Sequence, residues 1–239
     1  MTDSLRAALA TPDSKSRYVR RLFATIANRY DLITVVLSFG RDRAWKRRLV
    51  RYAVARPGQR ALDLACGTGD IALEIAREGA VVVGLDITPR MIQLARAKRP
   101  AGETHFLVGD MMSLPFPDRS FDLVTAGYGI RNVPSIGPAI AEIHRVLRPG
   151  GRVVSLDFNR PANRIVRTVY LGYLTVVGSA LGLLLHGDPD TYRYIPESIR
   201  PYPGAEGVAR LMRAAGFVEA GFVPLVGGLM AINWGERGR

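Results

Sequence analysis

Cysteine and histidine are scarce in this 239-residue chain, and both scarcities limit its chemistry. Cys66 is the only cysteine, so no intrachain disulfide can form and the chain suits a reducing compartment. Because it stands where a turn needs a small residue, we interpret Cys66 as a packing residue rather than a nucleophile. His105, His144 and His186 are too widely spaced for a metal-ligand pattern, and the sequence predicts no metal site.

Acidic residues are scarce at the start of the chain. Residues 1–60 hold 14 Lys and Arg but only 4 Asp and Glu, a net charge of +10, whereas the rest of the chain carries +2. A basic helix with aromatic residues suits an anionic membrane surface or nucleic acid, and a solvated face is the plain alternative. No second motif supports nucleic acid, so we expect no nucleic-acid partner and peripheral contact with an anionic membrane. Six basic residues lie near Trp45 and Tyr52: Arg41, Arg43, Lys46, Arg47, Arg48 and Arg51.

Charge is absent from Thr168 to Leu185, a run of 18 residues at the edge of the length that spans a bilayer. The run contains Gly178-x-x-x-Gly182, a spacing found where membrane helices pack closely. It lies, however, between two strands of one predicted sheet, which a span would pull apart. We therefore expect a buried or lid-forming helix with an apolar face suited to a lipid substrate. Because residues 1–10 lack a signal-peptide pattern, we expect a cytoplasmic, peripherally membrane-associated protein.

Strands and helices alternate from Arg60 onward. This alternation predicts an α/β fold with a mostly parallel, seven-stranded sheet and helices on both faces. The predicted strands are residues 61–65, 81–86, 104–108, 121–126, 152–158, 217–223 and 226–234, and the predicted helices are 16–27, 41–55, 69–78, 89–98, 135–147 and 204–215. We expect a single domain made of a basic helical N-terminal extension (1–57), a cofactor-binding core (58–158), a helical substrate-side insertion (159–203), and a last helix with two strands (204–239).

The most informative segment is Ala61-Leu-Asp-Leu-Ala-Cys-Gly-Thr-Gly-Asp70. Gly67 and Gly69 permit a tight turn that lies close to a ligand, and the following helix points its N-terminal N–H groups there. Asp86 ends the second apolar run, where an acid can accept both hydroxyls of a ribose. Asp110 ends the third, where an acid can meet an adenine amino group. The pattern therefore predicts a nucleoside-containing cofactor.

Two cofactor classes fit this loop. Gly67-x-Gly69-x-x-Ala72 followed by Asp86 satisfies a loose NAD fingerprint, so an NAD-dependent oxidoreductase is one candidate. Asp63 favours S-adenosylmethionine, because it lies four residues before Gly67 and can approach an ammonium group, whereas a pyrophosphate needs no such acid. Asp110 supports the same choice.

Several motifs together resemble the class I S-adenosylmethionine-dependent methyltransferases: Asp63-Leu-Ala-Cys-Gly-Thr-Gly69, Asp86, Asp110 and Leu147-Arg-Pro-Gly-Gly151. Further segments, spread over nearly the whole chain, resemble the UbiE/MenG family of quinone-biosynthesis C-methyltransferases. They are Phe23-Ala24-x-Ile26-Ala27-x-Arg29-Tyr30-Asp31, Ser38-Phe39-Gly40 with Trp45-Lys46, Leu114-Pro-Phe-Pro117, Tyr128-Gly-Ile-Arg-Asn-Val133, Arg145-Val-Leu-Arg-Pro-Gly-Gly-Arg152 and Asp190-Thr-Tyr-Arg-Tyr-Ile-Pro-Glu-Ser-Ile199.

The resemblance implies transfer of a methyl group to a ring carbon of a polyprenylated quinol, either demethylmenaquinol or a demethylated ubiquinol precursor. Another small or lipid-like acceptor and an RNA substrate are the alternatives, and a homo-oligomer stays open. The implied cofactor residues are Asp63, Gly67, Thr68, Gly69, Asp86, Asp110, Met111 and Gly127. The implied substrate residues are Tyr128, Tyr192, Arg193 and Tyr194, and the implied catalytic residues are Arg131, Asn132, Tyr30 and Asp31.

Arg131 follows the fourth predicted strand, beside the expected point of methyl delivery. Methylation of carbon needs electron density pushed from a ring hydroxyl into the adjacent carbon, and arginine is always protonated. We interpret Arg131 as the stabiliser of a quinol anion or the partner of a water that takes the proton. A structural salt bridge in the turn is the alternative.

The sequence departs from the family pattern near the expected substrate side. Ile33-Thr34 stand in place of Met-Asn, and Asp42 stands in place of a histidine. Asp157-Phe158-Asn159 replace Glu-Phe-Ser, and Gly127 stands where serine is frequent. These differences leave the exact substrate open and the cofactor site intact.

Overall fold

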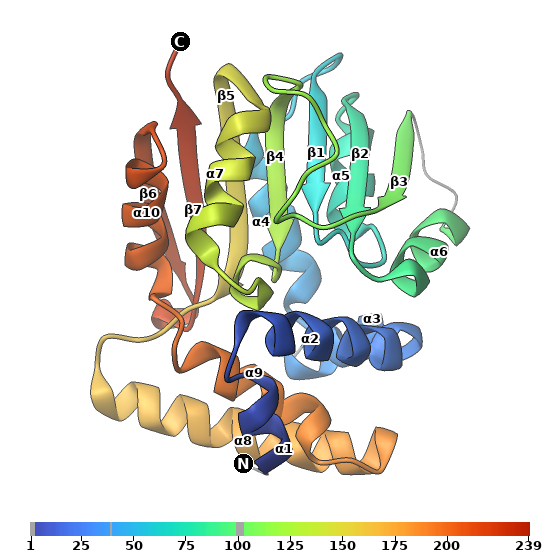
Figure 1. The fold of residues 1–239 in the computed structure, drawn as a ribbon, viewed down its shortest axis with the longest axis vertical. Coiled ribbons are helices and arrows are strands. Elements are labelled where there is room, and N and C mark those ends of the chain that lie inside the picture. The colour runs from blue at the N-terminus through green and yellow to red at the C-terminus, as the bar shows by residue number, and fades with distance from the viewer. Residues whose placement is uncertain (1–2, 39, 99–102) are drawn as a thin grey trace.

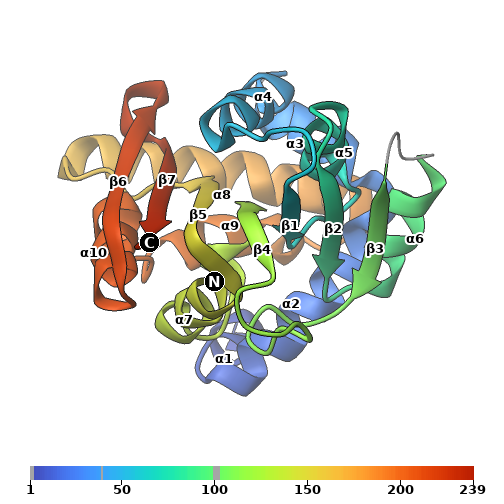
Figure 2. The same ribbon diagram turned by 90° about the horizontal axis from the view of Figure 1, so that it is seen from above.

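A sheet of seven strands forms the centre of the computed structural model, which describes residues 3–38, 40–98 and 103–239. Phe39 of the segment Ser38-Phe39-Gly40 thus lies outside the described residues. The strand order is β3-β2-β1-β4-β5-β7-β6, with the first five strands parallel and β7 antiparallel to both β5 and β6 (Figures 1 and 2). The strands are β1 (Arg60–Leu64), β2 (Val81–Asp86), β3 (Thr104–Val108), β4 (Phe121–Gly127), β5 (Leu147–Phe158), β6 (Phe217–Leu225) and β7 (Met230–Arg237). The predicted fold class is confirmed.

Helices cover both faces of this sheet (Figure 2). One face buries Leu49, Ile75 and Ile92 in an apolar layer, and the other buries Ile140 and Met212. Buried residues recur at helical spacing in these segments, which is why periodicity located them in the sequence. The helices on the first face are α4 (Asp42–Ala53), α5 (Asp70–Arg77) and α6 (Pro89–Ala97), and those on the second are α7 (Ile136–Val146) and α10 (Gly204–Ala214).

A cap of five helices lies below the carboxyl ends of the parallel strands (Figure 1). It consists of α1 (Asp3–Ala8), α2 (Pro12–Ile26), α3 (Tyr30–Leu37), α8 (Arg164–His186) and α9 (Asp190–Ile199). The sequence predicted α2 and the helical insertion, but within the predicted helical extension it gave no bounds for α1 and α3. Helix α3 exposes Leu32 and Val36, so its apolar residues point both inward and outward and no helical periodicity appears.

Strand β5 begins five residues earlier than the sequence predicted. Leu147 pairs with Phe121, and the register then shifts before Arg152 pairs with Leu123. Gly150 has φ +74°, a left-handed conformation that few other residues tolerate. The Pro149-Gly150-Gly151 break is therefore an irregularity within the strand rather than a loop before it.

Helix α8 packs on α9 through its two spaced glycines. A Cβ on Gly178 would lie 3.1 Å from the carbonyl oxygen of Tyr192, and one on Gly182 would lie 2.5 Å from that of Asp188. Gly178 thus gives α9 a close approach to α8, and Gly182 gives the same to the turn before α9. Among the described residues, α8 is the one helix that by itself is long and apolar enough to cross a membrane.

The outer face of α8 is apolar as well. Its exposed positions recur at helical spacing and therefore lie on one side of the helix. This apolar stripe consists of Ile165, Val169, Gly172, Val176, Ala180 and Leu183. The apolar run alone could not show that these residues are exposed, because a buried core helix has the same composition.

Candidate active site

Two adjoining cavities lie where the sheet meets the helical cap. The smaller one has a volume of about 80 Å³ and the larger one about 680 Å³. Phe23, Tyr30, Tyr128 and Asn132 line both cavities and so form their common wall. The larger volume lies within the range of small-molecule sites, and its walls are mostly apolar.

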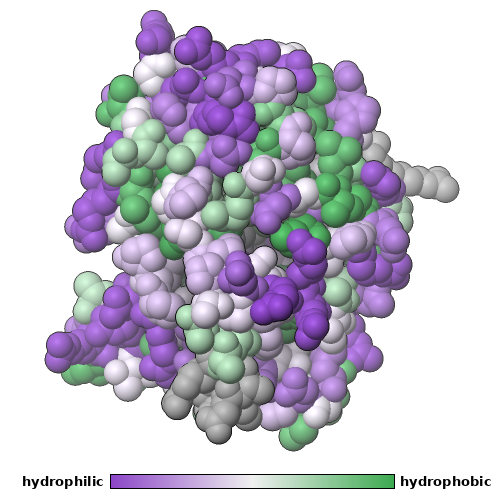
Figure 3. Space-filling view, in the orientation of Figure 1, coloured by the Kyte–Doolittle hydropathy of each residue, from purple (hydrophilic) through white to green (hydrophobic). Residues whose placement is uncertain are grey.

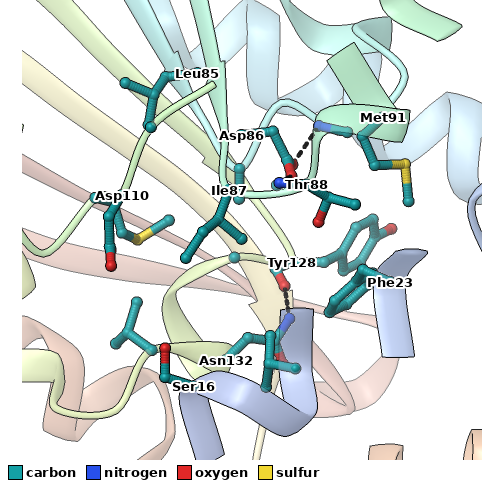
Figure 4. A pocket seen from close by; sticks show the side chains of 18 of the residues that line it. Ser16, Phe23, Leu85, Asp86, Ile87, Thr88, Met91, Asp110, Tyr128 and Asn132 are labelled. Carbon is teal, nitrogen blue, oxygen red and sulfur yellow. Dashed lines mark hydrogen bonds between the residues drawn. The ribbon is translucent and has the colours of Figure 1, made fainter. Parts of the chain in front are cut away.

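The smaller cavity collects residues from the ends of neighbouring strands. Asp86 ends β2, Asp110 follows β3 and Gly127 ends β4, and all three line the cavity with Gly67 and Met111. Figure 4 shows Asp86 and Asp110 on different walls, with Ser16 and Phe23 entering from the cap. Ligands of open α/β sheets bind at these carboxyl ends. These five predicted cofactor residues therefore converge where that rule places a ligand.

Asp86 holds the turn that forms the cavity wall. Its Oδ2 accepts a hydrogen bond from the Gly67 N–H at 2.9 Å, and its Oδ1 accepts one from the Thr88 N–H at 2.8 Å. Burial raises the pKa of Asp86, and these two hydrogen bonds oppose that rise. A carboxylate accepts about four hydrogen bonds, so Asp86 retains capacity for two hydroxyl donors.

Asp63 lies beneath the glycine loop and not on the wall of either cavity. Its side chain is fully buried, accepts from the Ala72 N–H at 3.1 Å and accepts from the Thr125 hydroxyl at 2.7 Å. Burial raises the pKa of Asp63 to about 7, against the effect of these hydrogen bonds. Asp63 thus supports the start of α5, and its direct contact with a cofactor stays a prediction.

Gly69 and Thr68 shape the same loop from outside the cavities. Gly69 has φ +86°, and a Cβ there would lie 2.9 Å from the ring of Phe106. Only glycine fits this position without displacing the ring. The Thr68 hydroxyl donates to Asp31 at 2.6 Å, which ties the loop to α3.

A chain of alternating carboxylates and ammonium groups runs across the base of the cap. Asp42 pairs with Lys46 at 2.6 Å, and Lys46 pairs with Asp70 at 2.9 Å. Lys98 then pairs with Asp70 at 2.7 Å and with Asp31 at 2.9 Å. This ion-pair chain joins α3, α4 and α5 and continues to the residue after α6. Asp31, predicted as catalytic, lies at its exposed end and lines neither cavity.

Arg131 lines the larger cavity and is held firmly in place. Its Nε donates to Asp157 at 3.2 Å, its backbone N–H donates to the same carboxylate, and its guanidinium also donates to the Ser198 hydroxyl. The rings of Phe158 and Tyr194 lie 5.2 and 5.9 Å from the guanidinium carbon. Asp157, one of the departures from the family pattern, is thus the anchor of Arg131.

Asn132 links the two cavities to α9. Its amide nitrogen donates to the Tyr128 carbonyl at 2.8 Å, and its amide oxygen accepts from the Tyr194 hydroxyl at 3.1 Å. The Tyr192 hydroxyl and His186 Nε2 lie 2.8 Å apart on the far side of the larger cavity. Arg193, predicted as a substrate residue, lines neither cavity and pairs with Asp190 at 3.5 Å.

Sequence reasoning missed two contributors to the site. Asp42 is 2% exposed, lines the larger cavity and accepts a hydrogen bond from the Tyr128 hydroxyl at 2.9 Å, yet the sequence marked it only as a departure. Lys15 of α2 donates to the carbonyl oxygens of Arg131 and Val133 at 3.1 and 2.6 Å. Burial and then the charge of Arg131 lower the pKa of Lys15 to about 8. No local sequence signal marks either contact.

The sequence profile of the ubiE/COQ5 methyltransferase family matches residues 11–237. The chain belongs to this family. It is 44% identical to a demethylmenaquinone methyltransferase of Thermus thermophilus, over 90% of this chain and all of the relative. It is 38% identical to the ubiquinone/menaquinone biosynthesis C-methyltransferase UbiE of Azotobacter vinelandii, over 95% of this chain and 93% of the relative.

Solved structures support the fold. A possible histamine N-methyltransferase of Thermotoga maritima, described as SAM-dependent, superposes with a TM-score of 0.67 at 19% identity, covering 92% of this chain and 99% of that one. A putative methyltransferase in complex with the Haloferax volcanii Trm112 activator gives a TM-score of 0.66 at 20% identity, covering 91% and 98%. The chain is an S-adenosylmethionine-dependent methyltransferase. The family membership decides between the two cofactor classes that the glycine loop left open.

Proposed function

We propose that this methyltransferase transfers a methyl group to a ring carbon of a polyprenylated quinol, either demethylmenaquinol or a demethylated ubiquinol precursor. The observation that carries the proposal is the apolar cavity of about 680 Å³ that shares a wall with the cofactor cavity. The names of the relatives point to the same substrate class.

The small cavity has the hydrogen-bond acceptors that the cofactor needs. Asp86 offers its remaining acceptor capacity to two ribose hydroxyls, and Asp110 offers a carboxylate to an adenine amino group. When bound, S-adenosylmethionine supplies an electrophilic methyl group on a sulfonium. Because residues of α2 fill part of the cavity, α2 moves outward to admit a molecule of that size.

The larger cavity has features suited to a quinol ring and its tail. Arg131 places a buried guanidinium, paired with Asp157 and flanked by two aromatic rings, on the wall of the larger cavity. A fixed cation stabilises an oxyanion that develops on the ring, so Arg131 is assigned this role. The apolar walls continue outward to Ile165 and Val169 of the apolar stripe, which suits a prenyl tail that leaves toward lipid.

The protein docks at an anionic bilayer on the cytoplasmic side through the apolar stripe and the basic residues around it. Arg41 lines the larger cavity and is exposed, as are Arg160 and Arg164 before the stripe. Figure 3 shows a largely hydrophilic surface at the projecting N-terminal end of α8 (lower left). An apolar stripe flanked by arginines is the arrangement of interfacial helices on anionic lipids.

A turnover assay tests the function. Purified enzyme with S-adenosylmethionine is offered demethylmenaquinol, a demethylated ubiquinol analogue, and each ring without its prenyl tail. We expect methylation of at least one tailed quinol, with a higher KM for its tailless form because the apolar cavity stays unfilled. Absence of turnover on every quinol, in protein that binds S-adenosylhomocysteine, contradicts the proposal.

A further inference from the structure

The wall of the larger cavity carries one buried carboxylate, bonded to Tyr128 of the shared wall, that the proposed function does not use. Asp42 begins α4 and is the only Asp or Glu among the described residues that line the larger cavity. No histidine of the described chain lines either cavity. A reaction that begins with loss of a ring hydroxyl proton therefore has one carboxylate within reach of the acceptor.

Tyr128 connects this carboxylate to the point where the methyl group crosses. Its hydroxyl donates to Asp42 Oδ1 at 2.9 Å, and its side chain lines both cavities. Burial and then the Asp42 carboxylate raise the pKa of Tyr128 well above its usual range, so the phenol keeps its proton and donates. Tyr128 has φ +59°, a costly conformation outside glycine that concentrates at active sites.

The charged groups around Asp42 contain one more carboxylate than ammonium groups. Lys46 of the same helix pairs with Asp42 Oδ2 and, on α5, with Asp70, so one ammonium serves two carboxylates. The whole ion-pair chain has three carboxylates and two ammonium groups, a net charge of −1. Tyr30 of α3 adds a phenol that burial keeps neutral by raising its pKa. One added proton therefore neutralises the chain.

We propose that Asp42 is the proton acceptor for the ring hydroxyl of the methyl acceptor, reached through the hydroxyl of Tyr128. This assignment rests on the proposed function. The ring O–H proton passes to the Tyr128 oxygen while the Tyr128 proton passes to Asp42 Oδ1. The electron pair left on the ring oxygen moves into the adjacent ring carbon, which bonds to the methyl carbon while the methyl–sulfur pair stays on sulfur. That ring carbon then loses its C–H proton to water, and Asp42 returns its proton through Tyr128 to the ring oxygen.

Asp42→Asn keeps the size of the side chain and removes its basicity. We expect kcat on the accepted quinol to fall about 100-fold or more, as for loss of a general base. The affinity for S-adenosylhomocysteine should change less than about threefold. The remaining rate should rise about tenfold per pH unit near neutrality, because only quinol already ionised in solution then reacts, and the wild-type profile should be shallower.

Three further variants separate a proton relay from structural support. Tyr128→Phe should lose rate to a similar extent, and the double variant Asp42→Asn/Tyr128→Phe should be no slower than the slower single variant, because both remove one relay. Asp42→His should recover part of the rate, since imidazole is a base near neutral pH. Asp122→Asn, the same change in a carboxylate bound to Arg148 at the start of β4, should keep the wild-type rate.

The outcomes distinguish the two proposals. Wild-type turnover of a quinol supports the function whatever the variants do, and its absence overturns both. With wild-type turnover present, Asp42→Asn within about threefold of the wild-type kcat overturns the role of Asp42. A variant that loses cofactor affinity in parallel with rate and keeps the wild-type pH profile overturns it as well. That pattern would indicate that Asp42 only supports the cofactor loop through the Lys46–Asp70 ion pair.

Discussion

Burial decides what each carboxylate of this enzyme does at the scale of single residues. Asp86 and Asp110 face the smaller cavity, Asp42 faces the larger one, and Asp63 lies under the glycine loop without reaching either. The same carboxylate group can therefore face a ligand site, accept a hydrogen bond from a neighbouring hydroxyl, or support the start of a helix, depending on where it is buried. Two predictions follow from the positions of Asp86 and Asp63.

Replacing Asp86 by Ala should weaken binding of S-adenosylhomocysteine about tenfold to a hundredfold. Hydrogen bonds to a charged group contribute about 1.5–3 kcal/mol, and the variant also loses the acceptor that holds the Gly67 N–H. Calorimetric titration measures the change. Asp118→Ala, in a carboxylate paired with Arg145 on the surface, should leave the affinity unaltered. Unchanged affinity in folded Asp86→Ala protein would remove Asp86 from the cofactor site.

Asp63 should make stability depend on pH. Its pKa is about 7 in the folded protein and near 3.8 when exposed, so the unfolded chain releases the proton first as pH rises. The contribution of Asp63 is therefore fully present below about pH 4 and is lost as pH rises to about 7. We compare the free energy of unfolding of the wild type with that of Asp63→Asn. The wild-type value minus the variant value should be about 3 kcal/mol more negative at about pH 8 than at about pH 5. Urea denaturation of both proteins measures this difference, and parallel pH profiles would contradict it.

The sequence predicted the strand-end residues and three residues of the shared wall, Tyr30, Tyr128 and Asn132, but it missed Asp42 of the larger cavity as a site residue. Asp86 and Asp110 could be predicted because parallel strands end at one edge of a sheet, whatever the rest of the chain does. Asp42 could not, because its hydrogen bond to Tyr128 joins residues 86 positions apart through the placement of α4 under the sheet. Side-chain pairs of that kind depend on tertiary packing, which no local pattern encodes.

The helices of the cap also show, at the scale of elements, which features a local sequence pattern predicts and which depend on tertiary packing. The sequence predicted α2 from its apolar spacing but gave no bounds for α3 within the predicted helical extension, because the exposed positions of α3 are apolar too. For α8 the sequence predicted a helix, but it did not decide whether the helix is buried in the protein or exposes an apolar face to a lipid. The structure shows one face against α9 and one face exposed, a division that rests on the two glycines.

Gly182→Ala should destabilise the protein by about 1–3 kcal/mol, because its Cβ would meet the Asp188 carbonyl oxygen at 2.5 Å. Gly172→Ala is the matched control, since the same helix has open space there. That variant should be neutral or more stable by up to about 1 kcal/mol, from helix propensity. Chemical denaturation compares the two, and equal effects would mean that the turn before α9 does not pack on α8 at Gly182.

Charge and apolar surface act together at the scale of the whole molecule. The N-terminal 60 residues carry +10, and five of the six basic residues near Trp45 are exposed, whereas Lys46 is buried in the ion-pair chain. The apolar stripe adds a surface that water solvates poorly. We therefore expect binding to anionic vesicles that has both an electrostatic and an apolar component.

Val176→Asp should weaken binding to phosphatidylserine-containing vesicles about tenfold or more, because it places a like charge at the lipid surface and removes apolar contact. Val218→Asp on β6 is the matched control, with 68% exposure against 70% for Val176. Rising salt should release the wild-type protein. Equal binding by both variants would place the docking surface elsewhere, and retention through high-salt and carbonate washing would favour α8 as a true span.

Helix α2 forms part of the wall of both cavities, with Val19 in the smaller, Leu22 in the larger and Phe23 in both. The space of about 80 Å³ beside it is small for an adenosyl cofactor, so we expect α2 to move outward when spent cofactor is exchanged for fresh cofactor. The same motion opens the chamber of the acceptor and breaks the bonds of Lys15 to the Arg131 loop. We expect release of both products to depend on movement of this one helix, so that product release rather than methyl transfer limits the rate of the catalytic cycle.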